Sequence, residues 1–143
     1  MAPPVEQLSC TVIGIIRQHG IDPPITVGKR WMLAAPRLLI IERKEAPGSY
    51  VLPGGKVEPG ETFLQALVRE IKEETDVVVE EATEFYRGLS VINSDRQVIV
   101  FNVNRWSGTP RTCEAGMSVR WGTEADLLAG PFAGFYKAMW GLP

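Results

Sequence analysis

Apolar residues recur at helical spacing in one segment of the chain. Its four apolar positions follow the pattern i, i+3, i+4 and i+7, and they are Leu64, Leu67, Val68 and Ile71. This spacing is typical of a helix that packs one face against a core. Thr62 precedes the segment and Gln65 follows three residues later, which is the pattern of a capping box. We therefore predict a helix that begins at Thr62 and buries this apolar stripe.

Shorter apolar runs, rich in β-branched residues, predict strands. These runs cover residues 8–16, 38–43, 50–52, 77–79, 84–92, 97–106 and 119–121. Residues 20–30 and the glycine-rich residues 53–60 are predicted to be loops. Two further helices are predicted at residues 123–128, with Thr123 as the N-cap, and at residues 131–140. Strands interspersed with helices, without regular βαβ alternation, indicate an α+β sandwich.

Composition narrows the class of protein. The 143 residues suit a single domain, and 45% hydrophobic with 22% charged residues exclude a disordered or fibrous chain. A net charge of −2 argues against a protein that grips a nucleic-acid backbone. Cys10 and Cys113 have no metal-binding spacing and are predicted to be reduced thiols. No apolar run approaches the roughly 20 residues of a membrane span, so we predict a soluble, cytoplasmic protein.

Three acidic residues lie off the apolar stripe of the predicted helix. At about 100° per residue, Glu70, Glu73 and Glu74 fall on one flank, where like charges repel each other. A hard divalent cation such as Mg²⁺ would relieve this repulsion, and Mg²⁺ in proteins is commonly shared with substrate phosphates. The alternative is an ordinary solvated acidic face. Gly54 and Gly55 just before the helix favour the first interpretation, because a glycine loop beside a helix start lets phosphate groups approach the backbone.

The spacing of these residues resembles a known family motif, the Nudix box. The family pattern is G-x5-E-x7-R-E-U-x-E-E-x-G-U, in which U is aliphatic, and eight of its nine specified positions match between residues 55 and 77. The matching residues are Gly55, Glu61, Arg69, Glu70, Ile71, Glu73, Glu74 and Val77. The departure is Asp76, where the family has Gly. Since Asp is a tolerable second choice for a left-handed helix C-cap, this departure concerns the end of the helix more than the chemistry.

The resemblance implies a fold, an activity and roles for residues. The fold is a Nudix-type α/β/α sandwich around a mixed sheet, formed by residues 1–143 as a single domain. The activity is hydrolysis of a nucleoside diphosphate linked to another group, with Mg²⁺ or Mn²⁺ as cofactor. The metal ligands implied are Glu70, Glu73 and Glu74, with Arg69 orienting a carboxylate and Glu61 supporting the loop and the helix. The catalytic set is thus Glu70, Arg69, Glu61 and Glu73.

A second segment resembles the mutator-type (MutT-like) branch of the family. Residues 106–110 read Trp-Ser-Gly-Thr-Pro, and Glu114 follows eight residues after the Trp. In that branch the corresponding Glu is a fourth carboxylate of the metal site. Arg43 resembles an arginine that contacts phosphate or base, and its alternative is a surface ion pair. Gly54, Gly55 and Lys56 are expected to contact the substrate. Residues 131–134 contain no Asn, although enzymes that sanitise oxidised guanine nucleotides place an Asn there.

The preferred function is hydrolysis of a nucleoside triphosphate to the monophosphate and pyrophosphate, with nucleotide-pool sanitising as one role. Other nucleotide substrates stay open: ADP-ribose, dinucleoside polyphosphates and the 5′ end of RNA. A non-catalytic nucleotide-binding module is less favoured, because the box retains its Arg and carboxylates. The expected partner is a small-molecule nucleotide, and a homodimer is left open. His19 is expected to be a surface imidazole, and the four tryptophans core or sheet-covering residues. The aromatic residue that stacks on a base is not identified.

Overall fold

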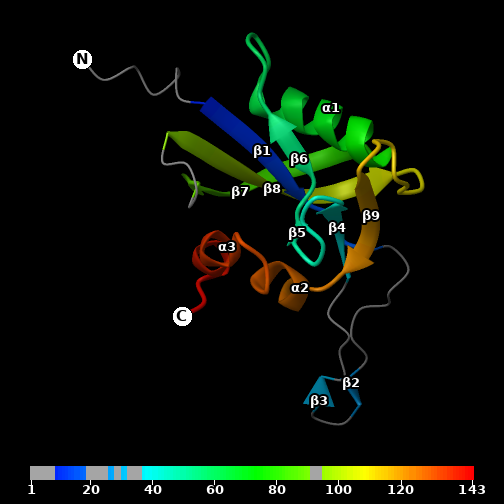
Figure 1. Cartoon of the computed structure of the whole chain (residues 1–143), viewed down its shortest axis with the longest axis vertical. Helices are drawn as coiled ribbons and strands as arrows, with labels where there is room; N and C mark the ends of the chain where they lie inside the picture. Colours follow the sequence, from blue (N-terminus) through cyan, green and yellow to red (C-terminus); the bar gives the residue numbers. More distant parts are fainter. Residues whose placement is uncertain (1–8, 19–25, 28–29, 32–36, 91–94) are drawn as a thin grey trace.

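The computed structural model describes residues 9–18, 26–27, 30–31, 37–90 and 95–143. Figure 1 shows their arrangement. The elements in chain order are β1 (Ser9–Ile15), β2 (Thr26–Val27), β3 (Arg30–Trp31), β4 (Leu38–Arg43), β5 (Tyr50–Val51), β6 (Gly54–Lys56), α1 (Phe63–Thr75), β7 (Val78–Leu89), β8 (Arg96–Ser107), β9 (Met117–Gly122), α2 (Glu124–Leu128) and α3 (Ala133–Trp140).

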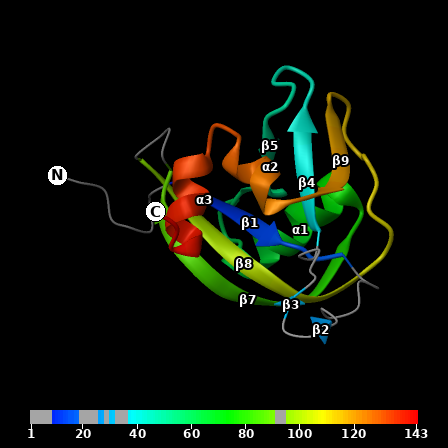
Figure 2. The same ribbon diagram turned by 90° about the horizontal axis from the view of Figure 1, so that it is seen from below.

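The central sheet is mixed. Its strand order is β6-β1-β8-β7, in which β1 runs parallel to β8 and antiparallel to β6, and β7 runs antiparallel to β8. A second sheet, β5-β4-β9, is antiparallel throughout. Helix α1 covers one side of the central sheet and α3 lies on the opposite side (Figures 1 and 2). The predicted α/β/α sandwich around a mixed sheet is therefore confirmed.

Successive side chains of β1 and β8 point alternately into two hydrophobic cores. Val12 of β1 and Ile99 of β8 are fully buried in the core that contains the apolar side of α1. Ile15 and Val100 are buried in the other core, with α2 and α3. Successive strand residues point to opposite faces of a sheet, so β8, like β1, contributes to both cores.

Helix α1 has the predicted N-terminus. The Thr62 hydroxyl accepts a hydrogen bond from the Gln65 amide at 3.1 Å, and the Gln65 side chain accepts one from the Thr62 amide at 2.9 Å. This reciprocal capping box satisfies two amides that a helix start would otherwise leave unpaired. At the other end, Asp76 is the C-cap with φ 62°, the left-handed conformation expected at this position.

The apolar stripe of α1 is only half correct as predicted. Leu67 and Ile71 are fully buried, whereas Leu64 is 45% and Val68 is 36% exposed. The buried face instead includes Ala66 and Glu74. The physical reason is that α1 packs against β6, an edge strand of the central sheet, as well as against β1 and β7, which turns the acidic flank partly inward.

Three other predictions are corrected. Residues 54–56 of the predicted glycine loop form strand β6, which pairs with β1 through Thr11–Lys56 and Ile13–Gly54. Residues 78–89 form one strand rather than two, with irregular register at three points along its pairing with β8. Within the predicted loop 20–30, β2 and the start of β3 form a short antiparallel pair. His19, and the strand ends predicted at Leu8 and at residues 91–92, lie outside the described residues.

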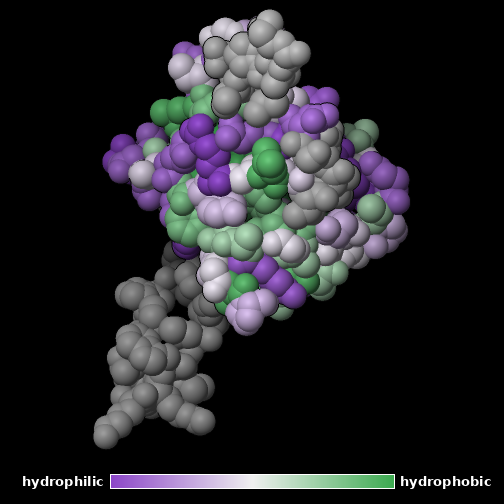
Figure 3. Space-filling model, turned by 90° about the vertical axis from the view of Figure 1, so that its left-hand side faces the viewer, coloured by the Kyte–Doolittle hydropathy of each residue, from purple (hydrophilic) through white to green (hydrophobic). Residues whose placement is uncertain are grey.

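Other expectations about the core and the surface can be compared directly. Trp106 is buried, its indole N–H donates to the Arg17 carbonyl at 2.9 Å, and its ring lies 5.8 Å from that of Trp121. Cys10 and Cys113 form no disulfide. On the face shown in Figure 3, hydrophobic and hydrophilic side chains are interspersed. None of the helices in the described ranges has the length and apolar character needed to cross a membrane.

Candidate active site

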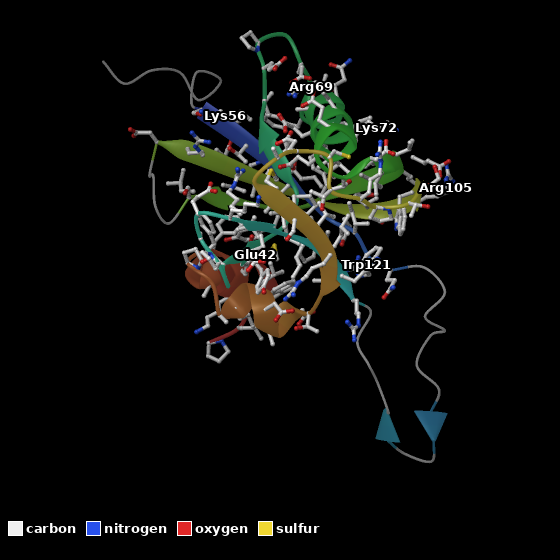
Figure 4. All side chains as sticks on the ribbon, turned by 45° about the vertical axis from the view of Figure 1, so that its right-hand side comes forward. Glu42, Lys56, Arg69, Lys72, Arg105 and Trp121 are labelled. Atoms are coloured by element: carbon white, nitrogen blue, oxygen red, sulfur yellow. The ribbon has the colours of Figure 1, made fainter. Side chains whose placement is uncertain are left out.

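Arg69 connects strand β6 to the carboxylates of α1. Its guanidinium donates two hydrogen bonds to Glu61, at 2.6 and 2.8 Å, one to Glu70 at 2.8 Å, and one to the Lys56 carbonyl at 3.1 Å. Figure 4 shows Arg69 on α1 near Lys56 of β6. These bonds hold the pKa of Glu61 at about 2, because Arg69 and the Glu58 amide both stabilise its charged form. The predicted roles of Arg69 and Glu61 are compatible with this geometry.

Two glycines bring the backbone of β6 against two carboxylates. The Gly54 amide donates to Glu74 Oε1 at 2.8 Å. A Cβ atom added at Gly55 would lie only 2.3 Å from Glu70 Oε2, and one added at Gly54 would collide with the Val12 carbonyl of β1. Glycine is therefore required at Gly54, at φ 153°, for strand pairing, whereas at Gly55 the missing side chain lets the Glu70 carboxylate approach the backbone.

Glu74 is a buried carboxylate with an unusual pKa. The pKa of Glu74 is raised to about 7, first by burial and also by the negative charges of Glu70 and Glu114, against the Gly54 amide and Arg43, which lower it. The side chain is 5% exposed. Glu114 and Arg43 therefore act electrostatically on Glu74, although they are distant from it in sequence.

Glu73 is placed differently from the other two box carboxylates. It is 52% exposed in its side chain and lies 3.4 Å from an Arg69 nitrogen. Across the described residues, no three His, Cys, Asp or Glu side chains converge closely enough to hold a metal ion as they stand. The cluster expected from helix spacing is thus not preformed, and the assignment of Glu70, Glu73, Glu74 and Glu114 as metal ligands stays a prediction.

The predicted substrate-binding residues line one cavity. Arg43, Gly54, Gly55 and Lys56 surround a space of about 370 Å³, within the usual size of a small-molecule site. Part of its wall is aromatic and comes from the C-terminal part of the chain, as Phe132, Phe135 and Tyr136. The cavity therefore joins cationic side chains and a glycine strand to an apolar, aromatic wall.

Sequence reasoning did not find three polar residues of this cavity. Arg96 and Thr11 both line it, and the Arg96 guanidinium donates to the Thr11 hydroxyl at 3.0 Å. Tyr136 is buried, and its hydroxyl accepts a hydrogen bond from the Leu52 amide at 3.2 Å. Burial raises the pKa of Tyr136 to about 12. The parallel pairing of β1 with β8, which brings residues 85 positions apart together, left no local signal in the sequence.

The loop that carries Glu114 is attached to the end of α1. The Arg111 amide donates to the Thr75 carbonyl at 3.0 Å, and Arg111 Nε donates to Asp76 Oδ2 at 3.0 Å. Lys72 donates to the other Asp76 oxygen at 2.6 Å. These two cations lower the pKa of Asp76. The loop then continues through Glu114 to strand β9.

Comparison with known proteins matches most of the chain to one family. Residues 27–139 match the model of the NUDIX domain. An 8-oxo-dGTP diphosphatase of Haemophilus influenzae is 36% identical over 94 residues, which are 64% of this chain and 68% of that protein. An ADP-ribose pyrophosphatase of Methanocaldococcus jannaschii is 54% identical over 44 residues, 29% of this chain and 26% of that protein.

Solved structures extend the similarity over nearly the whole chain. A MutT structure, from a study of the Aliivibrio salmonicida and Vibrio cholerae proteins, superposes with a TM-score of 0.67 at 27% identity, covering 91% of each chain. A MutT Nudix hydrolase from Burkholderia pseudomallei gives 0.60 at 26% identity, covering 85% of this chain and 94% of that one. Among the curated relatives, four alignments span only 15–26% of the relative's own length.

Proposed function

This chain belongs to the NUDIX domain family, and from that premise we propose that it hydrolyses a nucleoside triphosphate to the monophosphate and pyrophosphate. The observation that carries the proposal is the cavity that Arg43, Lys56 and the β6 glycines line together with an aromatic wall. Cations and backbone amides suit a phosphate chain, and aromatic rings suit a base. The 8-oxo-dGTP diphosphatase relative adds support for a purine nucleoside triphosphate.

The proposal includes a divalent cation. The donors available, Glu70, Glu74 and Glu114 together with Glu73, are the carboxylates that Mg²⁺ and Mn²⁺ favour. Their fit to a cation is supported by Glu74, which is buried near two other carboxylates that raise its pKa. When bound, the ion polarises phosphoryl oxygens and lowers the pKa of water at the site. We infer that Glu70 and Glu74 are the central ligands, because β6 holds both against its backbone.

The remaining steps belong to the chain's own side chains. Arg69 holds Glu70 by one hydrogen bond while Glu61 fixes the guanidinium by two, so the Glu70 carboxylate is oriented before substrate arrives. Arg43 and Lys56 bind the phosphates and neutralise their charge. The aromatic wall of Phe132 and Phe135 excludes water from one side of the base. This division of labour is typical of phosphoryl transfer, in which positioning and electrostatics dominate.

The test is a product assay with purified protein. Purine and pyrimidine dNTPs, oxidised dGTP, ADP-ribose, dinucleoside polyphosphates and 5′-triphosphate RNA are each incubated with Mg²⁺ and with excess EDTA. We expect Mg²⁺-dependent release of pyrophosphate and a monophosphate from at least one nucleoside triphosphate, and none with EDTA. A Glu70→Gln variant is the control for contaminating phosphatases. Turnover of ADP-ribose alone, or full activity in EDTA, would contradict the proposal.

A further inference from the structure

Asp76 holds a backbone conformation that an aspartate adopts at a cost. Among the described residues it is the single non-glycine position with positive φ, at 62°. Glycine adopts this conformation freely, and the Nudix box specifies glycine here. A backbone outlier that persists in spite of its cost points to a role for the side chain, so its contacts deserve an explanation beyond capping.

The side chain of Asp76 contacts two different elements. One oxygen accepts from Lys72 of the same helix at 2.6 Å, and the other accepts from Arg111 Nε at 3.0 Å. Arg111 is 35 residues away in the chain and belongs to the loop between β8 and β9. Of these two contacts of the Asp76 side chain, the one with Arg111 joins the end of α1 to that loop, and the one with Lys72 stays within α1.

Backbone contacts bring the same loop to the same helix end. The Arg111 amide donates to the Thr75 carbonyl at 3.0 Å. Gly108, with φ 94°, packs so closely that an added Cβ would lie 3.1 Å from the Asp76 carbonyl oxygen. The loop is therefore held against the C-terminus of α1 at two points before it continues to Glu114.

Glu114 lies three residues beyond Arg111, so its Cα is within about 10 Å of that of Arg111. Its charge acts on Glu74 of α1. After Glu114, the loop enters β9, with the Gly116 carbonyl accepting from the Lys44 amide at 2.8 Å. Glu114 thus sits between two fixed ends, one at β9 and one at the Asp76–Arg111 ion pair.

We propose that Asp76 and Arg111 are positioning residues, whose ion pair holds the loop so that the Glu114 carboxylate faces the carboxylates of α1. The inference rests on the proposed function, in which Glu114 is a ligand of the divalent cation. The aspartate replaces the flexible glycine of the motif with a charged contact across 35 residues of sequence. Lys72 offers a matched control, because it pairs with the same carboxylate without reaching the loop.

Three single variants and one double variant test the ion pair. In Arg111→Gln and Asp76→Gly, we expect the Mg²⁺ concentration for half-maximal activity to rise about three- to tenfold, with kcat at saturating Mg²⁺ within about twofold, because a misplaced ligand weakens binding more than it alters chemistry. In the double variant, the Mg²⁺ concentration for half-maximal activity should rise no further than in the more affected single variant. In Lys72→Gln, this Mg²⁺ concentration and kcat should both equal those of the parent chain.

Hydrogen exchange and thermal shifts give readouts that do not require turnover. The amides of residues 112–116 should exchange about tenfold faster in Arg111→Gln than in Lys72→Gln. The rise in Tm on adding Mn²⁺ should be smaller in Arg111→Gln and Asp76→Gly, while the Tm of metal-free Asp76→Gly equals or exceeds that of the parent, because glycine relieves the backbone cost.

The outcomes distinguish a failure of the proposed positioning role from a failure of the proposed function. If the exchange rate of amides 112–116 and the Mn²⁺-induced rise in Tm are the same in Arg111→Gln as in Lys72→Gln, Asp76 is only a helix cap and the inference is wrong. The parent chain could hydrolyse no nucleotide while Arg111→Gln still shows faster exchange of amides 112–116 and a smaller Mn²⁺-induced rise in Tm. In that case the proposed function fails and the positioning role stands. Additive effects in the double variant would also overturn the inference.

Discussion

The contact between Gly55 and Glu70 provides a direct test of how the site is built. Replacing Gly55 by Ala adds one methyl group on the edge strand β6. That methyl carbon would lie 2.3 Å from Oε2, 2.4 Å from Cδ and 2.8 Å from Oε1 of Glu70. The backbone at Gly55 has no positive φ, so alanine itself is tolerated there. The substitution therefore acts on the Glu70 carboxylate rather than on the fold.

The size of the effect follows from these distances. For the methyl to reach an ordinary contact of about 3.4 Å, the Glu70 carboxylate must move by about 1 Å, and its 2.8 Å hydrogen bond from Arg69 is lost or distorted. A displacement of about 1 Å in a catalytic constellation costs on the order of 100-fold in rate. We therefore expect kcat of Gly55→Ala to fall about 100-fold. Its Tm should change by no more than about 4 °C, since a shift near 1 kcal/mol has that scale for a domain of this size.

Gly60→Ala is the matched control. Gly60 has φ 84° and no atom within 4 Å of an added Cβ, so alanine there strains the backbone without contacting the site. We expect it to lower Tm by about 4 °C and to leave kcat within about twofold. The assay is steady-state pyrophosphate release beside a thermal melt of each variant. A Gly55→Ala protein with kcat within about threefold of the parent would refute the reasoning, because Glu70 would then act without its place against β6.

Three further predictions test the rest of the site. Glu74→Gln keeps the acceptor for the Gly54 amide but removes a buried charge, so Tm should stay level or rise while kcat falls at least about 100-fold; a normal kcat in a steady-state assay would contradict this. Because the folded-state pKa of Glu61 is lowered to about 2 from 4.5, its contribution to stability is present above about pH 4.5 and is lost as pH falls toward 2. The difference in unfolding free energy between the parent and Glu61→Gln, measured by urea titration, should shrink over that window, and a difference independent of pH would argue against the ion pair with Arg69. For oxidised guanine, kcat/KM should differ from that for dGTP by less than about a thousandfold. The cavity has no amide or carboxylate side chain among its lining residues, and an apolar surface such as that of Phe132 and Phe135 discriminates by roughly 10- to 200-fold. A preference of about 10⁴ or more would show that a polar group reads the base.

The helix and its caps could be predicted because their signals are local. The side chains of Thr62 and Gln65 each accept a hydrogen bond from the other's backbone amide, and Asp76 ends the helix in the conformation that its position demands. Strand β4 and the capped helix α2 also occupy the predicted residues. Each of these features depends on residues within a few positions, so spacing and residue type suffice to identify it.

The cavity lining that includes Thr11, Arg96 and Tyr136 could not be predicted, because it is made by contacts distant in sequence. Tyr136 reaches the Leu52 amide across 84 residues, and Arg96 reaches Thr11 across 85. Periodicity along one strand says nothing about which partner strand lies beside it. Likewise, residues 54–56 were predicted as a loop because glycine is common in loops, whereas Gly54 pairs in β6 because its missing side chain admits the Val12 carbonyl.

The misassigned apolar stripe of α1 shows how function competes with folding in this chain. An amphipathic helix would be most stable with Leu64 and Val68 buried, yet both are exposed and Glu74 is buried in their place. Burying a carboxylate beside Glu70 and within reach of Glu114 raises its pKa to about 7, which is unfavourable unless something else stabilises the charge. A sequence follows local rules everywhere except where a site requires otherwise. The exposed leucine and the buried glutamate therefore follow from one orientation of α1, in which Glu70 and Glu74 lie against the backbone of β6.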